Sequence, residues 1–181
     1  LYLFSQDGKL IKQLTSGKWV VMDVLGFNAK QKSILISSNE THPLHRNTFS
    51  VSVTTGKRTL LDNGRGTHNA IPSKSGQWFI DRYSEPDVPR NIDLVSTNHK
   101  VQRLLVSEDP WAGYQQPVSE GGSIKAADGV TDLYYRMVKP ADFDPGKKYP
   151  TVVYVYGGPH ANNVQASWHW ASRSWETYMA Q

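Results

Sequence analysis

The chain has 181 residues, of which 38% are hydrophobic and 11% aromatic, a composition typical of one ordinary folded domain or two small ones. Twenty basic and sixteen acidic side chains leave a net charge of +4, and their scatter argues against a clustered nucleic-acid-binding surface. No apolar run approaches the ~18 residues needed to span a bilayer. The absence of cysteine excludes disulfides, thiolate metal sites and a cysteine nucleophile.

The sequence begins inside a predicted strand, Leu1-Tyr2-Leu3-Phe4, without an initiator methionine. We therefore expect this chain to be part of a longer one, so the lack of a targeting segment says nothing about the parent protein.

Three stretches share one pattern: an alternating apolar strand, a polar turn that ends in lysine, and a second short strand. They are residues 1–14 (LYLFSQDGKLIKQL), 49–61 (FSVSVTTGKRTLL) and 92–106 (IDLVSTNHKVQRLLV). The turn lysines, Lys9, Lys57 and Lys100, are 48 and 43 residues apart. This spacing is close to the ~40–50-residue period of β-propeller blades.

The segments between these turns contain strand pairs of their own. Residues 20–24 precede residues 33–37, and residues 67–71 precede residues 77–83. Asn28-Ala29-Lys30 and Ser75-Gly76 lie between the members of each pair and suit hairpin turns. Each repeat therefore has about four short strands, which favours propeller blades over a generic antiparallel sandwich. About two blades fit in this chain, whereas a closed ring needs at least about four.

The character of the sequence changes after Asp109. Prolines and glycines punctuate residues 110–122, which we predict to be a linker. A hairpin follows, with strands predicted at residues 123–127 and 133–138 around the turn Asp128-Gly129.

The last part of the chain has the pattern of an α/β unit. Residues 151–156 (TVVYVY) are apolar on both faces, which is typical of the buried middle of a parallel sheet. Residues 164–181 show the three- and four-residue apolar spacing of an amphipathic helix. The predicted fold class is therefore mixed: antiparallel propeller blades over residues 1–109, then the first strands and helix of an α/β domain over residues 123–181.

The sharpest chemical signal is Tyr154-Val155-Tyr156-Gly157-Gly158, which lies where the predicted strand ends. Open α/β sheets place their ligands at this edge, and glycines let the backbone turn tightly and approach a ligand. A phenol keeps its proton at neutral pH, so Tyr156 is suited to donate a hydrogen bond to a developing oxyanion. On the residues alone, an ordinary sheet tyrosine followed by a glycine turn is an equally good interpretation.

Residues 148–160 (KYPTVVYVYGGPH) resemble the start of the peptidase domain of the prolyl oligopeptidase family of serine peptidases. A tyrosine before Gly-Gly-Pro, where other branches have histidine, resembles the dipeptidyl peptidase IV branch. The stretches Asp109-Pro110-Trp111-Ala112-Gly113-Tyr114 and Met137-Val138-Lys139-Pro140 fit the same resemblance. The upstream repeats also agree with the family's order, a β-propeller followed by an α/β-hydrolase domain.

The resemblance implies an enzyme that removes Xaa-Pro or Xaa-Ala dipeptides from peptide N-termini through a Ser-Asp-His triad. Tyr156 matches the tyrosine that stabilises the oxyanion, and Gly157 and Gly158 match the loop that shapes the oxyanion hole. The implied partners are a peptide with proline or alanine at its second position and the remainder of the parent polypeptide, with a homodimer as one option. The resemblance requires no cofactor, metal or nucleic acid, and it implies a periplasmic, secreted or cell-surface parent.

The sequence also departs from the family's full pattern. The nucleophile motif G-x-S-x-G is absent, and since the triad follows in the order Ser, acid, His, all three residues are expected beyond Gln181. The paired glutamates that hold the substrate's amine are expected before Leu1, and Glu40 and Glu85, which have no neighbouring glutamate, stay unassigned. We therefore predict that this chain alone is inactive.

Two alternatives remain open. One is an acylaminoacyl-peptidase-like or other prolyl oligopeptidase family hydrolase, against which Tyr156 argues because histidine is usual there. The other is a non-catalytic β-propeller-type binding module, which the missing triad supports.

The remaining candidate residues carry weaker signals. His42 and His45 are three residues apart on a turn with Pro43, and a surface loop is a better interpretation than a zinc site. His160 is disfavoured as a base because the triad histidine comes last. His169 is expected on one side of the C-terminal helix.

Three further groups are interpreted as structural. The tryptophans Trp168, Trp170 and Trp175 are expected to pack against the sheet rather than to stack on a ligand. The charges of residues 81–86 (DRYSEP) are expected to be solvated or mutually paired. Thr67-His68-Asn69 is interpreted as a blade turn rather than a catalytic dyad.

Overall fold

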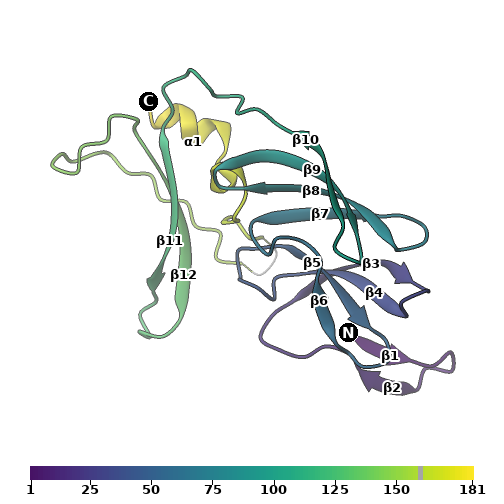
Figure 1. Ribbon diagram of the computed structural model, residues 1–181. Helices are drawn as coiled ribbons and strands as arrows, with labels where there is room; N and C mark the ends of the chain where they lie inside the picture. Colours follow the sequence, from purple (N-terminus) through teal and green to yellow (C-terminus); the bar gives the residue numbers. More distant parts are fainter. Residues whose placement is uncertain (159–160) are drawn as a thin grey trace.

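The computed structural model describes residues 1–158 and 161–181 (Figure 1). The described residues form antiparallel sheets with little helix: a 3-10 turn η1 (Trp168–Ala171) and a short helix α1 (Ser174–Met179). Neither of these helices has the length that crossing a bilayer requires, and the described part of the chain contains no other.

Two four-stranded sheets form the centre of the molecule, and in each the strands follow one another in chain order. The first blade sheet consists of β3 (Val21–Asn28), β4 (Ser33–Ser38), β5 (Asn47–Ser52) and β6 (Arg58–Leu60). The second blade sheet consists of β7 (Thr67–Pro72), β8 (Trp78–Glu85), β9 (Val88–Ser96) and β10 (Val101–Val106). Four antiparallel strands in sequence order make up a propeller blade, and the two sheets lie side by side in Figure 1.

The lysine turns occupy the same place in both blade sheets. Thr55-Gly56-Lys57 joins β5 to β6, and Asn98-His99-Lys100 joins β9 to β10. The first turn, Asp7-Gly8-Lys9, joins β1 (Tyr2–Phe4) to β2 (Leu10–Gln13) in a separate hairpin. The predicted repeat and its four strands are confirmed, and the described residues form no closed ring.

The core lies on both sides of the first blade sheet because β4 buries both of its faces. Side chains alternate along a strand, so the neighbours Leu35 (1% exposed) and Ile36 (0%) point in opposite directions. Ile36 packs with Leu14 beside the β1–β2 hairpin, whereas Leu35 packs with Phe79 of the second blade sheet. Each such side chain contributes about 1.5–3 kcal/mol. Leu35 therefore holds the second blade sheet against β4, and Ile36 holds the β1–β2 hairpin against its other face.

A buried amide also joins the two blade sheets. Asn28, at the end of β3, donates from Nδ2 to the carbonyl oxygen of Gly76 (3.1 Å) and to Oγ1 of Thr97 (3.2 Å). Gly76 adopts a left-handed backbone with φ of +64°. A Cβ at this position would lie 2.5 Å from the carbonyl oxygen of Phe27, so the predicted hairpin turn requires glycine for both conformation and space.

The β11–β12 hairpin follows, with β11 (Val118–Lys125) paired to β12 (Asp132–Lys139) around the turn Asp128-Gly129. The hairpin was predicted, but β11 begins at Val118, so residues 118–122 of the predicted linker are strand. Gly121 and Gly122, which indicated a loop, lie in β11 because aromatic rings cover them. A Cβ at residue 121 would lie 2.6 Å from the ring of Trp170, and glycines in strands often mark such close approaches.

The C-terminal part differs from the predicted α/β unit. Residues 151–156 have no regular secondary structure and are exposed; Val153 is 79% exposed. A strand that is apolar on both faces needs hydrogen-bonded neighbours and covering layers, and the described residues supply neither. Of the helix predicted over residues 164–181, only α1 has α-helical structure. His169, Trp170 and Ala171, shortly before α1, have positive φ angles and cannot continue a right-handed helix.

The contact between the blade sheets at Gly76 can be tested by comparison with Gly129. Gly129 has a similar φ of +69°, but the space around its Cβ position is open. Gly129→Ala is expected to cost about 1–2 kcal/mol, the usual penalty for a left-handed alanine. Gly76→Ala is expected to cost more, because the clash also separates the two blade sheets. Hydrogen exchange of β8 amides in the full-length protein measures the difference, and equal effects of the two variants would contradict it.

Candidate functional site

The tyrosine-glycine segment forms a turn whose two glycines have distinct backbone roles. Gly157 is left-handed with φ of +67°. At Gly158 a Cβ would lie 2.7 Å from Cε1 of the Tyr156 ring, so the ring lies over this glycine. The Tyr156 side chain is not packed into the interior, and the residue is 46% exposed. The segment therefore presents a partly exposed phenol beside a glycine turn, and its oxyanion role stays a prediction.

A buried histidine lies at the centre of a polar cluster in the blade sheets. His68 on β7 is 2% exposed and its ring stacks on Tyr83 at 4.8 Å. Nδ1 lies 2.7 Å from Oδ2 of Asp81, and Nε2 lies 2.7 Å from the carbonyl oxygen of Arg65. Because both ring nitrogens face oxygen acceptors, the doubly protonated imidazolium satisfies both contacts.

Asp62 brings a second buried carboxylate to this cluster, 3.8 Å from Nδ1 of His68. Its oxygens accept hydrogen bonds from the backbone N–H groups of Thr48 (2.6 Å) and Gly64 (2.9 Å). Burial raises the pKa of Asp62 despite the nearby His68 and these two donors. Asp62 therefore joins the β6–β7 connection to β5 as well as to the histidine.

The pKa of His68 is set by opposing effects. Burial alone lowers the pKa, but the hydrogen bond to Asp81 and the charges of Asp62 and Asp81 outweigh burial. The pKa of His68 is therefore above its ordinary value of 6.5, in agreement with the two-acceptor geometry.

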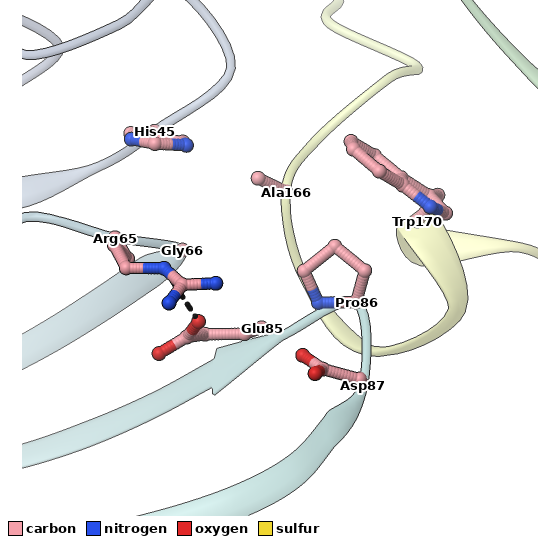
Figure 2. Close-up of a pocket in the computed structure, with 8 residues that line it drawn as sticks. All are labelled: His45, Arg65, Gly66, Glu85, Pro86, Asp87, Ala166 and Trp170. Atoms are coloured by element: carbon pink, nitrogen blue, oxygen red, sulfur yellow. Dashed lines mark ion pairs between the residues drawn. The ribbon is translucent and has the colours of Figure 1, made fainter. Parts of the chain in front are cut away.

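A half-open cavity of about 290 Å³ lies between the blade sheets and the C-terminal segment. Figure 2 shows His45 and Trp170 on opposite sides of it, with Glu85 and Asp87 along one wall. Oε2 of Glu85 pairs with Nε of Arg65 at 3.2 Å, so the more buried of the two carboxylates is already neutralised within the chain.

Comparison with known proteins places this arrangement in a family. The family described as "Dipeptidyl peptidase IV (DPP IV) N-terminal region" matches residues 1–90. Dipeptidyl peptidase 4 of Trichophyton tonsurans is 33% identical over 177 residues, which are 93% of this chain and 23% of that protein. The chain belongs to the dipeptidyl peptidase IV family.

Solved structures support the same assignment. A putative dipeptidyl aminopeptidase IV from Bacteroides ovatus is 47% identical, with a TM-score of 0.84 over 96% of this chain and 25% of the other. Dipeptidyl peptidase 4 of Porphyromonas gingivalis is 28% identical, also with a TM-score of 0.84, over 99% of this chain and 26% of the other. The chain thus spans only a small part of the length of its dipeptidyl peptidase IV relatives.

The structure describes three of the histidine candidates, His42, His45 and His169. His42 and His45 have ring centroids 4.9 Å apart, but Nδ1 of His42 accepts the backbone N–H of Leu44. No three His, Asp or Glu side chains cluster as metal ligands within residues 1–158 and 161–181. The candidate His160 lies outside the described residues. His169 lies in the η1 turn, not on a helix face as predicted.

Of the three groups interpreted as structural, two agree with the structure in part and one does not. Trp170 packs on Gly121 of β11, as expected for a tryptophan covering a sheet, whereas Trp175 is 42% exposed. Among the charges of residues 81–86, Arg82 is exposed as expected, but Asp81 and Glu85 are buried and pair with His68 and Arg65, outside the segment, rather than with each other or with solvent. His68 is not in a blade turn, because it lies on β7 with its ring in the interior. Sequence analysis also missed Arg136, a buried cation on β12, because a single arginine in a strand carries no local signal.

Replacement of His68 by glutamine tests the buried cluster. His68→Gln removes the cation beside two buried carboxylates and is expected to destabilise the protein by about 3–5 kcal/mol near pH 6. Because the folded-state pKa is raised, the stability from His68 is fully present below pH 6.5 and is lost as pH rises through the folded-state pKa. The difference between wild type and variant in urea unfolding should therefore shrink toward alkaline pH.

The exposed His99, which has a φ of +63°, provides the control. His99→Asn should be nearly neutral at every pH, since asparagine tolerates the left-handed region. A pH-independent effect of His68→Gln would show that His68 is not charged in the folded protein.

Proposed function

We propose that this chain is part of a dipeptidyl peptidase IV-like serine exopeptidase that releases Xaa-Pro and Xaa-Ala dipeptides from peptide N-termini. The observation that carries the proposal is the match to dipeptidyl peptidases over nearly the whole chain, at 33% identity in sequence and 47% to a solved structure. The order of the segments agrees with it, since propeller-like sheets precede the Tyr156-Gly157-Gly158 turn.

The proposal divides the chain into functional parts. Residues 1–109 are the C-terminal part of a β-propeller that admits peptides and excludes folded proteins. Residues 110–122 connect it to residues 123–181, which are the N-terminal part of the α/β-hydrolase peptidase domain. In this arrangement residues 151–156 become a central strand when neighbouring strands cover both faces, which the apolar pattern TVVYVY requires.

The proposed reaction is acyl transfer to a serine supplied by another part of the parent protein. The serine hydroxyl attacks the carbonyl carbon after the second substrate residue while a histidine accepts the hydroxyl proton. The carbonyl oxygen becomes negative, and Tyr156 donates its phenolic hydrogen bond to that oxyanion beside a backbone N–H. The histidine then gives its proton to the leaving amine as the C–N bond breaks, and water hydrolyses the acyl-serine to release the dipeptide. This chemistry requires neither a metal nor an organic cofactor.

Tyr156→Phe in the full-length protein tests the oxyanion role. Removal of one oxyanion donor typically lowers kcat by ~10²–10³, and a similar loss is expected with an Xaa-Pro chromogenic dipeptide. Tyr2→Phe, a substitution of an exposed tyrosine on β1, serves as the matched control and should leave turnover unchanged. Unchanged turnover in a folded Tyr156→Phe protein would remove Tyr156 from the mechanism.

The isolated chain provides a second test. Since the sequence lacks G-x-S-x-G, residues 1–181 alone should show no hydrolysis of the same substrate above the buffer rate. Hydrolysis by the isolated chain would contradict the proposed division of the active site. Absence of hydrolysis by the full-length protein as well would favour the non-catalytic binding module.

A further inference from the structure

Arg136 on β12 is a buried cation that binds the segment following the tyrosine-glycine turn. Its side chain is 12% exposed. Nη1 donates to the carbonyl oxygens of Asn163 (2.8 Å), Ala171 (2.6 Å) and Trp170 (3.3 Å), and Nη2 donates to Oε1 of Glu176 (2.7 Å). A single guanidinium therefore gathers three backbone carbonyls and one carboxylate, which its planar set of N–H donors permits.

Two of these carbonyls belong to a turn with an unusual left-handed backbone. His169, Trp170 and Ala171 have φ angles of +48°, +55° and +59°, which non-glycine residues rarely adopt and almost never in succession. Such strain persists only where surrounding contacts determine it, and it is concentrated at functional sites. Two of the three carbonyls in this turn are partners of Arg136, so Arg136 stabilises the left-handed turn directly.

The C-terminal segment contacts both blade sheets. The backbone N–H of His169 donates to the carbonyl oxygen of Pro86, between β8 and β9 (3.1 Å), and that of Ala166 donates to the carbonyl oxygen of Leu44, between β4 and β5 (3.0 Å). In Figure 1 the segment runs between the β11–β12 hairpin and the blade sheets. Arg136 thus holds a connection between the propeller-like part and the hairpin.

Glu176 extends this cluster toward the tyrosine. Its side chain is 13% exposed and accepts hydrogen bonds from Nη2 of Arg173 (2.9 Å) as well as from Arg136. The guanidinium of Arg173 lies over the ring of Tyr154, 4.6 Å from its centroid. Although burial raises the pKa of Glu176, the hydrogen bonds from Arg173 and Arg136 bring that pKa below its ordinary value, so the carboxylate is charged at neutral pH.

Tyr156 lies between two segments that this cluster holds. Arg173 contacts Tyr154, two residues before Tyr156, and Arg136 binds the carbonyl oxygen of Asn163, seven residues after it. We propose that the Arg136–Glu176 ion pair is a positioning device that fixes both flanks of the tyrosine turn and thereby the place of the Tyr156 hydroxyl. This inference rests on the proposed oxyanion role of Tyr156, and neither Arg136 nor Glu176 contacts the reacting atoms.

A double-mutant cycle in the full-length protein tests the inference. Arg136→Lys keeps the charge but cannot reproduce the planar set of contacts to three carbonyls and a carboxylate. Small displacements of a catalytic group cost up to about 10²-fold, and we expect kcat for an Xaa-Pro chromogenic dipeptide to fall about tenfold with KM nearly unchanged. In a Tyr156→Phe background the same substitution should change kcat less than about twofold, because the hydroxyl that it displaces is gone.

Two further variants keep the test decisive. Glu176→Gln removes the charge at the other end of the pair with little change in shape. It should also lower kcat in the wild type but not in the Tyr156→Phe background, and this comparison remains possible if Arg136→Lys folds poorly. Arg90→Lys, a substitution of an exposed arginine on β9, is the matched control and should leave kcat and KM unchanged.

The outcomes separate the two proposals. If Tyr156→Phe lowers kcat but the losses from Arg136→Lys and Glu176→Gln simply multiply with it, the positioning role is overturned while the oxyanion role stands. If Tyr156→Phe leaves kcat unchanged, the oxyanion role fails, and positioning through Tyr156 fails with it. A loss of kcat that disappears in the Tyr156→Phe background supports both.

Discussion

The architecture depends on one strand that is buried on both faces. Leu35 and Ile36 are adjacent on β4, so their side chains point in opposite directions, and both are almost fully buried. The β1–β2 hairpin covers the Ile36 face, and the second blade sheet covers the Leu35 face. This packing sets the position of the β8–β9 turn, where the carbonyl of Pro86 accepts the N–H of His169. Apolar packing at β4 therefore determines where the C-terminal segment docks.

The blade repeats were predictable because their signals are local. Alternating apolar residues and short polar turns depend on neighbours in the sequence, so the strand order and the turns at Lys57 and Lys100 followed from the sequence alone. Gly121 shows the limit of this approach. Its sequence context indicates a loop, but it lies in a strand because the ring of Trp170, far later in the chain, occupies the space above it.

The buried cations were not predictable for the same physical reason. Nothing near His68 or Arg136 in the sequence marks them among six histidines and twenty basic residues. Each is defined by acceptors from distant segments: Asp81 and the carbonyl of Arg65 for His68, and carbonyls beyond residue 162 for Arg136. Burial of a charge is costly unless the charge is paired and hydrogen-bonded. His68 and Arg136 can therefore be buried only where distant segments of the chain come together and supply the acceptors.

The tyrosine turn, residues 154–158, follows an apolar segment that lacks sheet partners, and side chains of distant residues contact its flanks. Residues 151–156 are apolar on both faces yet exposed, so their burial requires strands that the described residues do not supply. The contacts that hold the flanks of the turn are of a different kind, because Arg173 on Tyr154 and Arg136 on Asn163 are formed within the chain. Burial of residues 151–156 would therefore depend on strands from elsewhere, whereas the proposed Arg136–Glu176 device acts within the chain, where it holds the tyrosine turn relative to the β11–β12 hairpin. A phenol held in this way keeps its position through contacts outside Gly157 and Gly158, as a preorganised donor to an oxyanion must.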